Sequence, residues 1–157
     1  MKHRAPASGR SRAPVAGNVR PLAHFRVMPT QLRIARPVSA LDRSADMYRK
    51  GLGLMEIGRF ENHDGFDGVM LGRPDLQYHF EFTYRRAHPV VPTPTPEDLL
   101  VFYLPDANKW RQACASMLEA GFVEVSSFNS YWQQRGRTFE DYDHYRIVLE
   151  QAQWEQS

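Results

Sequence analysis

The sequence is poor in cysteine and in long apolar runs, and both shortages exclude classes of protein. Its 157 residues include one cysteine, Cys114, so an internal disulfide and a CxxC zinc or redox site are excluded. No apolar run comes near the ~20 residues of a membrane-spanning helix, and no segment has the apolar core of a secretory signal. Glycine-rich phosphate loops, GxSxG and a Ser/His/Asp pattern are also missing. We therefore expect a cytoplasmic protein without a membrane partner.

The charges are unevenly distributed. Residues 1–41 hold eight basic residues and no acidic residue, whereas residues 42–157 hold 12 basic and 18 acidic residues, a net charge of −6. Residues 1–30 mix Arg, Ala, Pro, Gly and Ser with little apolar periodicity, which predicts a disordered basic tail. The tail is open to interpretation as a nucleic-acid-binding arm, a transit peptide, a membrane-surface anchor or an upstream extension. We favour the extension and expect no nucleic-acid partner, because the tail has few aromatic residues to stack on bases.

Residues 31–157 are predicted to form two copies of one βαβββ module. The first copy covers residues 31–86 and the second covers residues 98–151. Between them, residues 87–97 are rich in proline, which excludes a helix or a central strand and predicts a stiff linker. The order of the elements predicts an α+β fold that arose by duplication.

A matched pair of segments supports the duplication. Gly53–Phe60 and Gly121–Phe128 align at a constant offset of 68 residues, with Gly, Glu, a β-branched residue and Phe in equivalent places. Because Phe128 is the counterpart of Phe60, we expect Phe128 to be buried.

The helices of the two modules are predicted from their apolar spacing. Ser39 and Asp42 offer a capping pattern at the start of the first helix. Cys114 lies on the apolar stripe of the second helix, so we expect a buried and unreactive thiol rather than a nucleophile.

Four stretches of the chain resemble the vicinal oxygen chelate superfamily, which includes glyoxalase I, bleomycin-resistance proteins, fosfomycin-resistance enzymes and extradiol dioxygenases. Leu32–Tyr48 with Gly51–Leu54 resembles the opening strand and helix, and Tyr78–Phe82 resembles the fourth strand. Asp141–Leu149 is similar to the closing D-P-D-G-N turn and strand. The resemblance implies two tandem βαβββ modules that form a curved, cup-like mixed sheet with the helices outside.

The closing turn departs from the pattern of the superfamily. Tyr142 replaces the usual proline, and His144 and Tyr145 replace Gly and Asn. We expect His144 to be exposed.

The resemblance also implies four metal-ligand positions, one on the first and one on the fourth strand of each module. In this sequence they fall on Arg33, Glu81, Leu99 and Val148. Only Glu81 has a donor suited to a divalent metal. The sequence is therefore similar to members that bind a small molecule without a metal, and we expect no cofactor. A shift of register on the last strand would instead present Glu150 or Arg146.

His79 and Glu81 share a strand face and have two interpretations. They could be a metal-ligand pair or an acid/base pair, which would make the protein a metal-dependent lyase, isomerase or dioxygenase such as a glyoxalase I-like lyase. Alternatively, Glu81 pairs with Arg33 on the neighbouring strand while His79 lines a polar cup. We favour the ion pair, and whether the protein is an enzyme stays open.

Aromatic residues are predicted to gather at the mouth of the cup. They are Tyr103, Phe128, Tyr131, Trp132 and Tyr145. Large rings among polar residues are typical of a binding rim and equally of a dimer contact. The candidate ligand-binding residues are Arg33, His79, Glu81, Tyr103, Tyr131 and Trp132. We also expect a homodimer in which Trp132 or Trp110 loses exposure.

Overall fold

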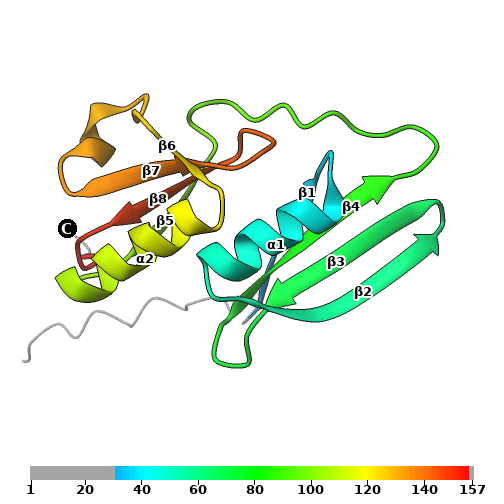
Figure 1. Cartoon of the computed structure of the whole chain (residues 1–157), viewed down its shortest axis with the longest axis horizontal. Helices are drawn as coiled ribbons and strands as arrows, with labels where there is room; N and C mark the ends of the chain where they lie inside the picture. Colours follow the sequence, from blue (N-terminus) through cyan, green and yellow to red (C-terminus); the bar gives the residue numbers. More distant parts are fainter. Residues whose placement is uncertain (1–30, 156–157) are drawn as a thin grey trace, which may run out of the picture.

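The computed structural model describes residues 31–155 (Figure 1). The predicted basic tail, residues 1–30, lies outside the described residues. The elements in chain order are β1 (Leu32–Pro37), α1 (Leu41–Gly51), β2 (Met55–His63), β3 (Phe66–Gly72), β4 (Tyr78–Arg85), β5 (Leu99–Tyr103), α2 (Ala107–Glu119), β6 (Val123–Val125), the 3-10 helix η1 (Ser130–Gln133), β7 (Gly136–Glu140) and β8 (Arg146–Glu150). Neither α1 nor α2 is long and apolar enough to cross a membrane.

Each half of the chain forms a four-stranded mixed sheet with one α-helix, and the two halves have the same topology. The first sheet has the order β1-β4-β3-β2 and the second has the order β5-β8-β7-β6. In each sheet the first pair is parallel and the other pairs are antiparallel. The α+β fold of two tandem βαβββ modules is therefore confirmed.

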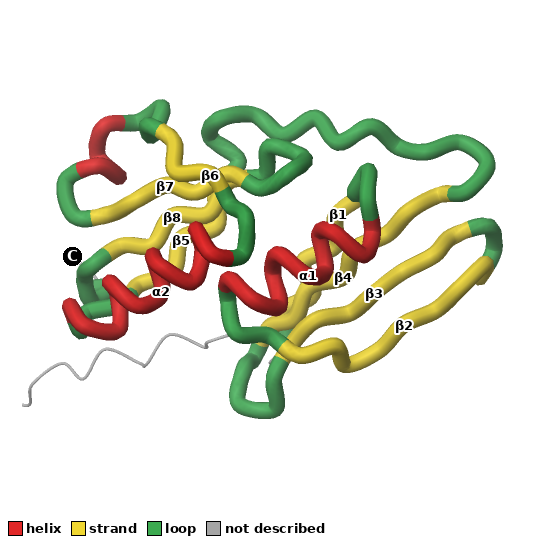
Figure 2. The backbone as a smooth tube through the Cα atoms, in the orientation of Figure 1, coloured by secondary structure: helices red, strands yellow, loops and turns green. Residues whose placement is uncertain are grey.

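The two modules pack side by side with both α-helices in front of the sheets (Figure 1). α1 and α2 are in contact. Residues 86–98 connect the sheets without a helix or strand, and Figure 2 shows this connection along one edge of the molecule.

One aromatic core joins the two modules on the helix side of the sheets. Tyr48 of α1 is fully buried, and its ring centroid lies 5.1 Å from that of Phe80, 4.7 Å from Phe82 and 5.3 Å from Phe122. Phe122 belongs to the second module, so Tyr48 contacts both. Such pairs contribute about 0.5–1.5 kcal/mol each beyond their buried area. Gly51 permits this contact, because a Cβ there would lie 3.0 Å from the Phe122 ring.

A set of polar contacts, the module clamp, also joins the two halves. The Tyr48 hydroxyl donates to Asp141 Oδ2 at 2.8 Å and accepts from Arg36 Nη1 at 3.1 Å. The Tyr145 hydroxyl donates to the Pro37 carbonyl at 3.1 Å, and Arg36 lies 4.4 Å from the centre of the Tyr145 ring. Burial raises the pKa of both Tyr48 and Asp141. Tyr145 therefore makes a contact between the two modules.

The predicted cap of α1 is wrong. The N-cap residue is Ala40, which makes no side-chain hydrogen bond to the helix. Ser39 instead donates through its hydroxyl and its backbone N–H to Asp143 of the closing turn. Asp42 accepts from Arg59 Nη1 at 2.9 Å. Both polar side chains make long-range contacts, which the local pattern does not reveal.

The predicted burial of Phe128 is also wrong. Its relative exposure is 74%. β6 ends at Val125, so Phe128 lies beyond the strand and cannot occupy the position that Phe60 has in β2. The predicted burial of Cys114 is confirmed, and burial raises the pKa of its thiol.

Each sheet has one face against the helices and one face without a helix in the described chain. In β4, Phe80 and Phe82 are buried in the core, whereas His79 and Glu81 point to the helix-free face. In β8, Ile147 and Leu149 belong to the core, so alternate residues of that strand point to the helix-free face. The candidate sites lie on these two helix-free faces.

Candidate functional site

A charged cluster of Arg33, His79 and Glu81, hereafter the Arg33 cluster, lies on the helix-free face of the first sheet. The parallel pairing of β1 with β4 places Arg33 opposite His79, and Glu81 is two residues further along the same face. Arg33 Nη1 lies 2.6 Å from Glu81 Oε2, and Arg33 Nε donates to His79 Nε2 at 2.9 Å. The predicted Arg33–Glu81 contact is therefore confirmed, and His79 joins it.

The Arg33 cluster is open to solvent. The side chain of Arg33 is 54% exposed and that of Glu81 is 15% exposed. Because Arg33 donates to His79 Nε2, that nitrogen presents its lone pair and the ring proton resides on Nδ1. The exposed part of the guanidinium has the geometry to hold a carboxylate or carbonyl group.

The residues at the four expected metal-ligand positions do not fit a divalent metal. Glu81 is the only oxygen donor among them, and it is bonded to Arg33. Leu99 and Val148 have no donor atom, and arginine stays protonated. Within residues 31–155, no group of three or more His, Cys, Asp or Glu side chains is arranged to hold a metal ion.

A second candidate site, hereafter the Glu150 pocket, lies at the end of the second sheet beside η1. It has a volume of about 280 Å³. Its lining residues are Tyr103, Tyr131, Arg135, Glu150, Ala152, Gln153, Trp154 and Glu155. Tyr103 of β5 lies directly opposite Glu150 of β8, because the two strands are paired in parallel. The pocket thus forms where these strands end and the chain continues past them.

Local hydrogen bonds hold the walls of the Glu150 pocket. Asn129 accepts from the backbone N–H of Tyr131 at 3.0 Å and fixes the start of η1. The Gln151 N–H donates to the Arg135 carbonyl at 2.8 Å, which holds the residues after β8 against the segment after η1. The ring centroids of Tyr103 and Trp154 are 6.1 Å apart.

Glu150 is a buried carboxylate whose two oxygens have different surroundings. Its side chain is 3% exposed, and Oε1 lies 3.7 Å from Arg135 Nε. Oε2 is buried and has no hydrogen-bond partner among the described residues. Burial raises the pKa of Glu150, although Arg135 opposes this effect. Gly136 faces Glu150 across β7 and β8, and a Cβ at Gly136 would collide with Oε2.

The structure divides the predicted ligand-binding residues between two sites. Arg33, His79 and Glu81 form one group, and Tyr103 and Tyr131 line the other. Trp132 packs against Tyr131 with ring centroids 4.9 Å apart. No hydrogen bond or ion pair joins the two groups within residues 31–155. Their roles in binding stay predictions.

The sequence pattern did not select Glu150 or Trp154. Glu150 lies two residues after Val148, so strand alternation places it on the same face, and this was the available signal. Nothing in the sequence indicates that the residues after β8 bring Trp154 back to Tyr103.

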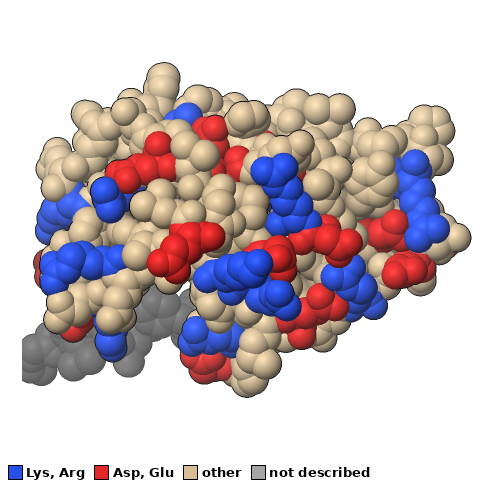
Figure 3. All heavy atoms as spheres, viewed as in Figure 1, with Lys and Arg blue, Asp and Glu red and all other residues tan. Residues whose placement is uncertain are grey.

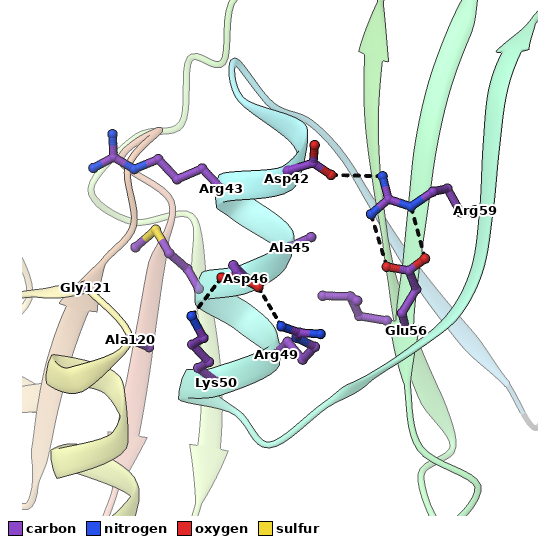
Figure 4. Close-up of a pocket in the computed structure, with 12 residues that line it drawn as sticks. Asp42, Arg43, Ala45, Asp46, Arg49, Lys50, Glu56, Arg59, Ala120 and Gly121 are labelled. Atoms are coloured by element: carbon purple, nitrogen blue, oxygen red, sulfur yellow. Dashed lines mark hydrogen bonds and ion pairs between the residues drawn. The ribbon is translucent and has the colours of Figure 1, made fainter.

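A groove of about 640 Å³ lies on the helix side between α1 and β2 (Figure 4). Arg59 bonds to both Asp42 and Glu56, and Asp46 bonds to Arg49 and Lys50. Basic and acidic side chains are interspersed over this side of the molecule (Figure 3). The acidic groups of this groove are all paired in solvated ion pairs, and its remaining cation, Arg43, lies 3.7 Å from the centre of the Tyr142 ring.

Comparison with known proteins identifies relatives for both modules. The model of the YycE-like N-terminal domain matches residues 32–83, and that of the YycE-like C-terminal domain matches residues 97–151. YycE of Bacillus subtilis (strain 168) is 45% identical over 119 residues, which cover 76% of this chain and 86% of the relative. A crystal structure of Bacillus subtilis YycE, described as a candidate glyoxalase/fosfomycin resistance protein of unknown function, has a TM-score of 0.74 at 42% identity and covers 81% of this chain and 93% of that chain.

More distant structures share the fold alone. Glyoxalase I of Leishmania major has a TM-score of 0.57 at 19% identity, covering 80% of this chain and 86% of that chain. TnmS3, an antibiotic-binding protein from Streptomyces sp. CB03234, has a TM-score of 0.55 at 18% identity. The match covers 82% of this chain and 99% of that chain. The resemblance to the vicinal oxygen chelate superfamily is confirmed.

Proposed function

Because this chain belongs to the YycE-like family, which has the vicinal oxygen chelate fold, we propose that it binds a small organic molecule between its helix-free sheet faces without a divalent metal. The Glu150 pocket carries this proposal, since aromatic walls around a few polar groups are typical of small-molecule sites. The shared fold with an antibiotic-binding protein is consistent with it, although a fold does not by itself imply a function.

In this proposal, the Arg33 cluster holds the ligand from the first sheet. Its exposed guanidinium would take the electrostatic place that a metal has in other members, and would bind an anionic or carbonyl group. The rival role for Arg33 is an internal ion pair with Glu81 and no contact to a ligand. A double-mutant cycle of Arg33→Met and Glu81→Gln separates the two roles.

The binding cup is proposed to close in a homodimer. A two-fold arrangement would place the first sheet of each copy against the second sheet of its partner and cover both helix-free faces at once. Large apolar side chains support this arrangement, because Met55 and Ile57 on β2 are 55% and 54% exposed. Tyr103 and Tyr131 on the second module are also exposed.

Light scattering tests the dimer. We expect twice the chain mass of 18.2 kDa, with Trp132 or Trp110 less accessible to a quencher than in a monomer. Ile57→Glu should give monomers, whereas Val90→Glu, at a similarly exposed apolar residue of the connection, should not. A wild-type monomer at high concentration would contradict the dimer.

A thermal-shift screen of small molecules and divalent metals tests the function. A specific ligand should raise the melting temperature by mass action. The melting temperature should not rise with Zn, Ni, Mn or Fe, and a chelator should leave it unchanged. Tight binding of one metal per chain would contradict the metal-free proposal.

The alternative is a metal-dependent lyase, isomerase or dioxygenase that uses His79 and Glu81. The observation in its favour is that these two side chains lie side by side on an open face, both in contact with Arg33. For this function Arg33 would have to release them. Stoichiometric metal that is lost in Glu81→Gln would support this alternative.

A further inference from the structure

We propose that the Glu150 pocket binds the protonated amine of its ligand, with the Glu150 carboxylate accepting a hydrogen bond from the ammonium group. Tyr103, Tyr131 and Trp154 would flank the cation. This inference rests on the proposed small-molecule binding and names the chemical class of one part of the ligand.

The carboxylate of Glu150 is the main argument for a cation. Burying a hydrogen-bond acceptor without a partner costs free energy of folding, and burying an unpaired charge costs more. Oε2 has no partner among residues 31–155, and Arg135 Nε is 3.7 Å from the other oxygen, which is beyond hydrogen-bond distance. An ammonium group supplies both a donor and a compensating charge.

The other lining residues agree with a cation. Glu150 and Glu155 are acidic and Arg135 is basic, so the formal charge of the lining is −1. Arg135 is 64% exposed and can stay in water while the deeper carboxylate binds the ligand. Aromatic rings stabilise a nearby cation through their electron-rich faces, and three of the lining residues have such rings.

The size of the pocket limits what it can hold. At about 280 Å³ it lies just below the ~300–1,000 Å³ of sites for drug-sized ligands. An amine attached to one ring is a suitable occupant, and the rest of a larger ligand would extend over the sheet. Gly136 leaves room for the carboxylate of Glu150, because a Cβ there would collide with Oε2.

Benzylamine and benzyl alcohol are suitable probes because they have similar shapes and differ in charge. Binding to the full chain at pH 7 is measured by calorimetry or by tryptophan fluorescence. We expect benzylamine to bind at least about tenfold more tightly than benzyl alcohol, which is the value of one hydrogen bond to a charged group. Glu150→Gln should abolish this preference and leave the affinity for benzyl alcohol unchanged.

Two controls keep the result interpretable. Glu119→Gln removes the same charge from an exposed position on α2 and should retain the preference. The circular dichroism and melting temperature of Glu150→Gln show whether it is folded, and we expect it to be at least as stable as wild type. Trp154→Ala removes an exposed ring and should weaken benzylamine binding without loss of stability.

The outcomes separate this inference from the proposed function. Equal affinities for the two probes, or a preference that survives in Glu150→Gln, would overturn the amine assignment. If neutral compounds from the screen bind while benzylamine has no advantage, the binding function stands and the amine class is wrong. If neither the probes nor any compound of the screen binds, both are wrong.

Discussion

The helix-free faces of the two modules have the same strand topology, and each has a glutamate whose surroundings differ from those of the other. On the first sheet, Arg33 pairs with Glu81 where the arginine is 54% exposed. On the second sheet, Glu150 is buried and one of its oxygens has no partner among the described residues. The first face thus presents a carboxylate that is 2.6 Å from an arginine, whereas the second presents a carboxylate whose ion pair with Arg135 is 3.7 Å long.

The difference shows how a duplicated module can carry different side chains at equivalent places. Parallel pairing of the first and last strands places residues from both on one face in each sheet. On the first sheet the neighbouring strand supplies an arginine, and on the second it supplies Tyr103. Glu81 is paired with Arg33, whereas Glu150, opposite Tyr103, has one oxygen without a hydrogen-bond partner among the described residues.

The largest expected effect comes from breaking the core that holds the two faces together. Tyr48→Ala should lower the free energy of unfolding by about 3–5 kcal/mol, because it removes a buried ring that contacts both modules. Tyr48→Phe should cost about 1–3 kcal/mol, because Asp141 then loses a buried donor. Urea denaturation followed by tryptophan fluorescence measures both. Two separate unfolding transitions in the wild type would contradict a shared core.

Glu150→Gln sharpens the comparison on the second face. It should raise the free energy of unfolding by about 1 kcal/mol at pH 7, because the variant no longer buries a charge without a full set of partners. The pKa of Glu150 is higher in the folded protein than in the unfolded chain. The native state therefore holds this proton to higher pH, and stability falls as the pH rises from the ordinary glutamate range through the raised pKa.

The difference in stability between wild type and Glu150→Gln should follow this pH dependence. Denaturation curves at a series of pH values measure it, and the raised pKa of Asp141 cancels because both proteins contain that residue. A loss of stability in Glu150→Gln at pH 7 would mean that the carboxylate has a partner in the folded protein.

Arg33→Met makes the corresponding change on the first face. Stability should fall by less than about 1 kcal/mol, because the ion pair is exposed. Affinity for a compound found in the screen should fall by about 1.5–3 kcal/mol, if Arg33 holds a charged group of that compound. If Arg33 has only the internal role, Arg33→Met should destabilise the protein, and adding Glu81→Gln should largely restore stability. Unchanged affinity in Arg33→Met would contradict the anchoring role.

The smallest expected effect concerns the turn before β8. His144 has a φ of 70°, where the superfamily pattern has glycine, and its ring is within 2.7 Å of Glu140 Oε1. This contact raises the pKa of His144, so its stabilisation is present below the ordinary histidine pKa and is lost as the pH rises through the raised value. His144→Gly should remove this pH dependence and change stability by no more than about 0.5 kcal/mol, because backbone relief and the lost contact oppose each other. A larger loss in thermal denaturation would show that the histidine is required by the turn.

Much of the fold could be predicted because its signals are local. The alternation of apolar residues places His79 and Glu81 on one face, and the helical spacing places Tyr48 in the core. The constant offset between Gly53 and Gly121 marks the duplication. These patterns have periods set by the geometry of single strands and helices, so the sequence determines them without knowledge of the neighbours.

Contacts between distant segments were decided by the tertiary structure. Ser39 has the sequence of a helix cap, yet its hydroxyl bonds to Asp143 because the module clamp brings the closing turn to that end of α1. Phe128 matches Phe60 in the repeat, yet it is exposed because β6 ends early. Alternation alone puts Glu150 on the helix-free face. Its carboxylate is buried, with one oxygen that has no partner among residues 31–155. This burial depends on the absence of a side chain at Gly136 and on the path of the chain after β8, which bring together groups that no local pattern connects.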